Sequence, residues 1–127
     1  MRILVVEPGC RPEVREIDGS LKSMQEIVGG LIQSVPLYDE PAVVLVCNDE
    51  GRLLGLPLNR ALYEPGSSVP YDIISGTFFL CGAPSNSDHF KSLTDEQIPR
   101  CTERFALPEI FLNFNGQIIV VPVKTVD

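Results

Sequence analysis

Five polar side chains in and around the apolar stretch 43–62 have the chemistry to hold a small anionic ligand. A guanidinium can grip a phosphate or carboxylate through two parallel hydrogen bonds, and Arg60 is the candidate for that role. Side-chain amides such as those of Asn48 and Asn59 can bond the polar edge of a base or sugar. The predicted ligand-binding residues are Asn48, Arg52, Asn59, Arg60 and Thr77.

The same residues have an alternative, purely structural use. Asn59 would then cap a short helical turn, and Arg60 would form an ion pair with Asp72 or Glu64. The sequence leaves both uses open.

Catalytic residues are not predicted. The chain lacks the Gly-x-Ser-x-Gly, Walker and Gly-x-Gly-x-x-Gly motifs. A small hydrolase or transferase would need the single histidine, His89, or a cysteine such as Cys81 to meet other polar groups in a cleft. We therefore expect a protein that is not an enzyme.

The four cysteines are spaced far apart and do not form a ligand pattern. Zinc sites usually take two ligands from one short turn, and no Cys-x-x-Cys or Cys-x-x-His pair occurs here. We expect no metal site and no cofactor. The cysteines are Cys10, Cys47, Cys81 and Cys101.

The formal net charge of -7 argues against direct nucleic-acid binding, which depends on clustered Lys and Arg. An acidic surface can keep a protein soluble, or it can imitate the charge of DNA and occupy a DNA-binding partner. The apolar runs are far shorter than the roughly 20 residues of a membrane span, and the N-terminus has no secretory features. We expect a cytoplasmic protein with no membrane partner.

Turn signals and apolar runs divide the chain into the elements that must position these residues. Helices are predicted after Ser20, ending at Gly29, and after the capping box Thr94–Gln97, where Pro99 should distort the start. Gly76 indicates a bulge or a close backbone approach. Strands are predicted at residues 2–7, 13–17, 31–37, 42–47, 52–55 and 71–82, with a helical turn at 59–62 and an Asn-Gly hairpin joining 111–114 to 117–123.

Seven or eight strands and two helices, with the helices separated from runs of strands, predict an α+β fold. The sheet should be mostly antiparallel, and residues 42–47 should form a central strand buried on both faces. The chain is expected to be a single domain over residues 1–127, with residues 106–127 as a C-terminal hairpin extension.

Several segments carry a resemblance to a known family: residues 5–9, 16–21, 25–30, 45–48, 55–57 with 59–62, 72–74 with 76–79, and 92–98. Through these segments residues 1–105 resemble an uncharacterised family, domain of unknown function 3846, which is associated with phages, plasmids and their bacterial hosts. This chain departs from the family pattern at Leu58, where the family has a proline, and at Pro99, where it has an ordinary helix former.

The resemblance brings a context and no catalytic residues. It implies an accessory protein of a mobile element, acting in the host cytosol. We expect an anti-defence protein, a homo-oligomer that binds and sequesters a nucleotide-like, phosphate-bearing immune signal. The alternative is an acidic protein–protein inhibitor or DNA mimic acting on a host defence or restriction protein.

Overall fold

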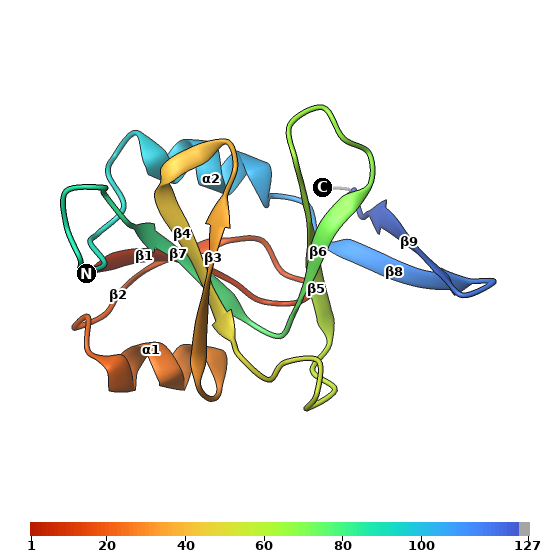
Figure 1. Ribbon diagram of the computed structural model, residues 1–127, viewed down its shortest axis with the longest axis horizontal. Coiled ribbons are helices and arrows are strands. Elements are labelled where there is room, and N and C mark those ends of the chain that lie inside the picture. Colours follow the sequence, from red (N-terminus) through yellow and green to blue (C-terminus); the bar gives the residue numbers. More distant parts are fainter. Residues whose placement is uncertain (125–127) are drawn as a thin grey trace.

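The computed structural model describes residues 1–124. Its main element is a five-stranded antiparallel sheet with the strand order β2-β1-β7-β4-β3 (Figure 1). Every residue of the middle strand, β7, is buried. The predicted strand 42–47 belongs to β4, which lies beside β7 rather than at the centre. The strands are β1 (Arg2–Val6), β2 (Glu13–Glu16), β3 (Ile32–Leu37), β4 (Glu40–Asn48) and β7 (Phe78–Gly82).

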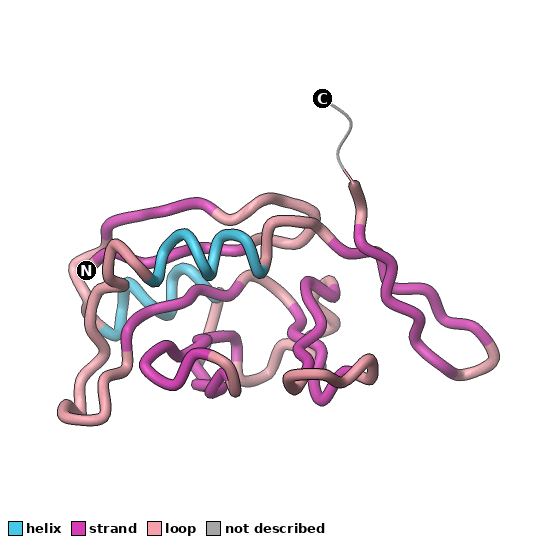
Figure 2. Tube along the Cα trace, turned by 90° about the horizontal axis from the view of Figure 1, so that it is seen from above, coloured by secondary structure: helices cyan, strands magenta, loops and turns pink. Residues whose placement is uncertain are grey.

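Two helices cover opposite faces of this sheet (Figures 1 and 2). Side chains alternate between the two faces along a strand, so β1 contributes to two separate cores. Ile3 packs in the core that contains α1 (Leu21–Val28), and Leu4 packs in the core that contains α2 (Gln97–Arg104). Every interior strand is therefore apolar on both sides.

A second, two-stranded sheet joins the core on the side of α2. It consists of β5 (Leu58–Tyr63) and β6 (Pro70–Ser75), which contribute Leu62 and Ile74 to the core. The third sheet is a hairpin of two strands, β8 (Glu109–Phe114) and β9 (Gln117–Pro122). This hairpin projects away from the rest of the molecule (Figures 1 and 2). The predicted Asn-Gly turn is confirmed, with φ of 51° at Asn115 and 80° at Gly116.

The helix ends form as the sequence predicts. Ser20 Oγ accepts a hydrogen bond from the Ser23 amide, and Gly29 ends α1 in the left-handed conformation. The capping box before α2 is reciprocal, because Thr94 Oγ1 accepts from the Gln97 amide while Gln97 Oε1 accepts from the Thr94 amide. The Ile98 amide donates to the Thr94 carbonyl, but Pro99 has no N–H to make the next bond of this i to i−4 series. The regular helix therefore begins only at Gln97.

The fold class is confirmed as α+β with mostly antiparallel sheets, and the nine strands in the described residues exceed the predicted seven or eight. The predicted strand 71–82 is divided into β6 and β7 at Gly76, which has φ of 82°. A Cβ at Gly76 would lie 2.7 Å from Leu56 Cδ1, so the predicted close approach is present.

Two local predictions are wrong. Residues 52–55 form turns rather than a strand, and residues 59–62 lie in β5 rather than in a helical turn. The turns at 52–55 are held by local backbone hydrogen bonds, such as Leu54 N–H to the Glu50 carbonyl and Gly55 N–H to the Arg52 carbonyl. β5 is extended because it pairs with β6, and the local sequence alone does not reveal that pairing.

Candidate functional site

Arg60 lies in the interior of the protein, with 1% of its surface exposed. Its Nη2 donates hydrogen bonds to the carbonyl oxygens of Cys10, at 2.6 Å, and Phe105, at 3.0 Å. Its Nη1 donates to Asn59 Oδ1 at 2.9 Å and to the Asn59 carbonyl oxygen at 3.3 Å. The guanidinium therefore joins the turn after β1, strand β5 and the end of α2.

The environment of Arg60 differs from the ion pair with Asp72 or Glu64 that the sequence left open as its structural use. Arg60 forms a salt bridge with neither carboxylate, and Asp72 pairs with Arg52 instead. Burial lowers the pKa of Arg60, while the nearby carboxylate of Glu109 raises it. Four bonds to uncharged oxygens take up the Nη atoms, so the charged group is solvated by the protein itself.

Asn59 is completely buried and connects two other parts of the chain. Its Nδ2 donates to the carbonyl oxygens of Val6 and Gly76, both at 2.9 Å. Its Oδ1 accepts from Arg60, so three of its four hydrogen-bonding positions are filled. Asn59 and Arg60 together form a buried polar network between the sheets.

Asn48 also makes its hydrogen bonds within the chain. Its Nδ2 donates to the Val28 carbonyl at 3.1 Å, and its Oδ1 accepts from the Glu50 amide at 2.8 Å. The first bond holds the end of α1 against β4, and the second shapes the turn that follows β4. Thr77 is half-buried in the link between β6 and β7, next to the Gly76 carbonyl that Asn59 bonds.

Asn48 and Arg52 meet in a cleft of about 360 Å³ between the turn after β4 and strand β6. The exposed Arg52 donates to Asp72 Oδ1 at 3.2 Å and to the Ile73 carbonyl at 3.3 Å. Asp72 shares the cleft with Asp49 and Glu50, so carboxylates outnumber the single arginine. A phosphate would be repelled there. The structure thus brings together two of the five predicted residues and places the other three outside this cleft.

Arg60 borders a separate recess of about 200 Å³ at the base of the C-terminal hairpin. Its buried Nε has no hydrogen-bond partner among the described residues. Arg104 lines the same recess, and burial lowers its pKa. Glu109 also lines it, accepts from the Ala61 amide at 2.7 Å, and has a pKa raised by burial.

The residues considered for nucleophilic chemistry do not meet. Burial raises the pKa of Cys81 to about 12 and that of Cys47 to about 11, so both thiols are protonated at neutral pH. His89 lies exposed in a loop. Within residues 1–124, no cluster of His, Cys, Asp and Glu side chains could hold a metal ion, and neither helix is long and apolar enough to cross a membrane.

The sequence did not point to Glu109 or Arg104 as neighbours of Arg60. Both lie more than forty residues away along the chain, and neither belongs to a motif. Ser75 was also missed, although its buried Oγ is without a partner among the described residues and it lines the cleft beside Arg52. No local signal identifies a serine of this kind.

A family model described as a domain of unknown function (DUF3846) matches residues 1–106. The match covers the five-stranded sheet, both helices and the β5–β6 sheet, and it ends before the β8–β9 hairpin. Comparison with curated proteins and with solved structures gave no match.

Proposed function

We propose that this chain, which belongs to the DUF3846 family, acts without catalysis by occupying a basic surface of another protein. The observation that supports this proposal is that basic and acidic side chains differ in how often they are paired. The basic side chains are largely engaged within the chain, whereas many carboxylates are free. The arginines in ion pairs with carboxylates are Arg2, Arg15, Arg52, Arg100 and Arg104.

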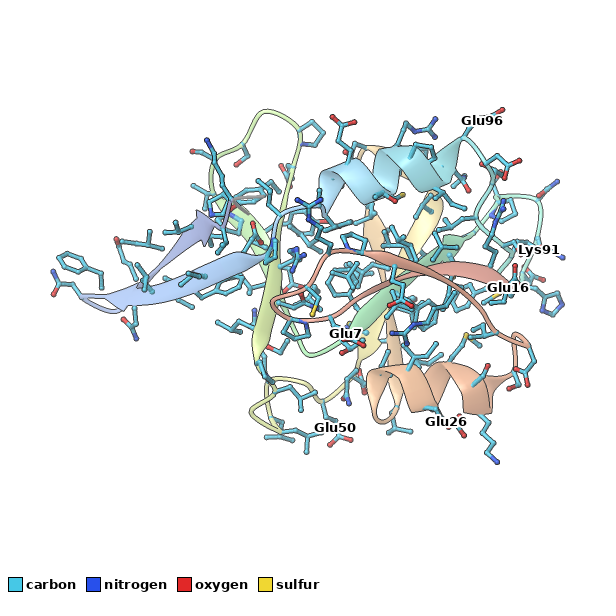
Figure 3. All side chains as sticks on the ribbon, turned by 180° about the vertical axis from the view of Figure 1, so that it is seen from behind. Glu7, Glu16, Glu26, Glu50, Lys91 and Glu96 are labelled. Atoms are coloured by element: carbon cyan, nitrogen blue, oxygen red, sulfur yellow. The ribbon has the colours of Figure 1, made fainter. Side chains whose placement is uncertain are left out.

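Free carboxylates lie on both sides of the body: Glu26 and Glu50 near α1, and Glu96 beside α2 (Figure 3). Among the described residues, several exposed acids have no salt-bridge partner: Glu26, Glu50, Glu64, Asp88 and Glu96. Glu26 and Glu50 line one shallow hollow of about 640 Å³ between the end of α1 and the turn after β4. Lys22 also lines the hollow, so two carboxylates face one cation there. We call it the acidic hollow and assign it to a basic partner.

The class of partner follows from charge and context. An acidic protein competes best for a surface that evolved to bind the phosphates of nucleic acid. The association of the family with phages and plasmids favours a host defence or restriction protein as that target. The chain would act in the host cytosol, as an inhibitor that occupies the DNA-binding site.

The proposal is tested by displacement of DNA. We expect the chain to release a fluorescent 20-base-pair duplex from at least one of a panel of purified bacterial restriction and nucleic-acid-sensing proteins. Inhibition should weaken as salt rises from about 50 to 200 mM, since the contact is electrostatic. The double variant Glu26→Gln/Glu50→Gln should weaken inhibition about tenfold.

A matched control removes two charges that are already paired. Glu7→Gln/Glu13→Gln changes the net charge equally, but both of its carboxylates bond Arg15. Inhibition should be nearly unchanged in this control. Failure to displace DNA from any member of the panel would end the proposal, and equal losses in the two double variants would reduce it to a bulk charge effect.

The recess beside Arg60 supports a second candidate, the sequestration of a phosphate-bearing signal. Two arginines line it together with Glu103 and Glu109, so carboxylates do not outnumber cations there, and Arg60 Nε is unpartnered among the described residues. Its volume of about 200 Å³ is below the ~300 Å³ of typical ligand pockets, so only the phosphate end of a nucleotide would enter.

Calorimetry with ADP-ribose and with cyclic dinucleotides tests this candidate. We expect heat of binding that Arg104→Met reduces at least tenfold. The control is Arg100→Met on the same helix, which removes an ion pair to Glu40 outside the recess. No heat with any of these ligands would reject the candidate.

A further inference from the structure

The β8–β9 hairpin has one face against the body and one face in solvent. Cross-strand partners share a face of a hairpin, and the register pairs Ile110 with Val121 and Leu112 with Ile119. Phe114 lies on this same face, which we call the outer face. Its apolar side chains are all well exposed: Ile110 50%, Leu112 50%, Phe114 64%, Ile119 44% and Val121 39%.

The opposite face is turned partly toward the body. Phe111 and Val120 lie on it and are half-buried, whereas Ile118, 49% exposed, borders a hollow formed with the β5–β6 sheet. The hairpin is therefore anchored over part of this face. Its outer face remains uncovered by any described residue, although an isolated pair of strands is only marginally stable in water.

Apart from Glu109 at its base, the hairpin carries no charged side chain. Residues 110–123 contain no Asp, Glu, Lys or Arg, so the net charge of -7 lies entirely outside them. Two copies of the chain repel each other wherever their bodies approach. The hairpin projects beyond the body and is the part at which two copies can meet without that repulsion (Figures 1 and 2).

The edges of the main sheet are protected in a way that the hairpin is not. The edge strand β2 carries Glu13, Arg15 and Glu16, and the other edge strand, β3, carries Pro36. Charges and proline on an edge discourage pairing with another chain. Among the described strands, β9 is hydrogen-bonded to β8 alone. It contains no charged residue, and its single proline, Pro122, is its last residue.

We propose that the outer face of the hairpin is covered by the same face of a second copy, related by a two-fold axis. An isologous contact of this kind requires a self-complementary surface, and an uncharged apolar face meets that requirement. Five side chains about half exposed bury roughly 500 Å² per copy, or ~1,000 Å² in total, which is the lower bound for a specific interface. The contact gives a weak dimer.

The association state as a function of concentration tests the dimer. In sedimentation velocity from about 1 to 500 µM, we expect the full chain to shift from one-chain to two-chain mass. Leu112→Glu should weaken dimerisation at least tenfold, because it places two like charges in an apolar contact. Asn113→Glu is the matched control, adjacent in sequence and on the opposite face, and should dimerise like the wild type.

Two further measurements test whether the substitution merely unfolds the hairpin, and distinguish the dimer contact from binding of a basic partner at the acidic hollow. Leu112→Thr retains a strand-forming residue without adding a charge and should also weaken the dimer. Raising the salt concentration should strengthen dimerisation by screening the two bodies, whereas it should weaken binding to a basic partner. A monomer throughout the concentration range, a dimer that persists in Leu112→Glu, or equal losses in the two Glu variants would overturn the proposal.

Discussion

Replacing Arg60 with methionine is expected to lower the free energy of unfolding by about 3–5 kcal/mol, the largest effect of any polar substitution in this chain. Methionine fills a similar volume but donates no hydrogen bond. The carbonyl oxygens of Cys10 and Phe105 would lose the bonds they receive from Arg60 Nη2. The Phe105 carbonyl is buried, and a buried acceptor left unpaired costs about 1–3 kcal/mol, whereas Cys10 is exposed and its carbonyl can bond water instead.

Urea unfolding followed by far-UV circular dichroism measures this effect. The matched control is Arg52→Met, which removes an exposed arginine and its ion pair with Asp72. An exposed pair contributes about 0–1 kcal/mol, so the control should unfold close to the wild type. Similar costs for the two variants would show that Arg60 does not stabilise the fold in the way its contacts indicate.

The contrast between these two arginines shows where inference from sequence succeeds and where it ends. Composition and residue type selected both as candidates, and nothing local distinguishes a buried guanidinium from an exposed one. The partners of Arg60 come from the turn after β1, from β5 and from the residue that ends α2, and these segments meet only in the folded protein. A buried arginine of this kind can be recognised only when the tertiary structure is known.

The features that the sequence predicted well depend on neighbours along the chain. The cap at Ser20, the capping box at Thr94 and the hairpin at Asn115 are each specified within four residues. The wrong assignment at 59–62 concerns a segment whose structure depends on pairing with β6, whereas residues 52–55 form turns closed by local backbone hydrogen bonds. Asn59 resembled a helix cap because asparagine favours caps, whereas here its amide bonds two distant carbonyls.

The polar network between the sheets also explains why a pair of polar residues occurs within an apolar stretch. The buried amide of Asn59 and the Nη atoms of Arg60 bond groups on distant segments, and these bonds fix the position of β5 relative to β1 and α2 more narrowly than apolar contacts alone. The predicted ligand role of Asn59 and Arg60 stays a prediction. Their observed contacts give them a structural role that does not require a ligand.

Asn59→Ala is expected to cost about 2–4 kcal/mol, because it leaves the carbonyls of Val6 and Gly76 without their donor and removes an acceptor from Arg60. Asn86→Ala, in an exposed loop, is the matched control and should be near neutral. The same urea unfolding experiment measures both variants.

A double-mutant cycle then tests whether Asn59 and Arg60 act as one unit. Either single substitution breaks the bond from Arg60 Nη1 to Asn59 Oδ1, so the double variant Asn59→Ala/Arg60→Met loses it only once. The cost of the double variant should fall short of the sum of the single costs by about 1–2 kcal/mol. Strict additivity would mean that the two residues stabilise the protein independently. Coupling between Asn59 and Arg60 would instead explain the presence of these two polar residues in β5 by their contribution to stability alone. The candidate functional surfaces would then be the acidic hollow and the outer face of the hairpin.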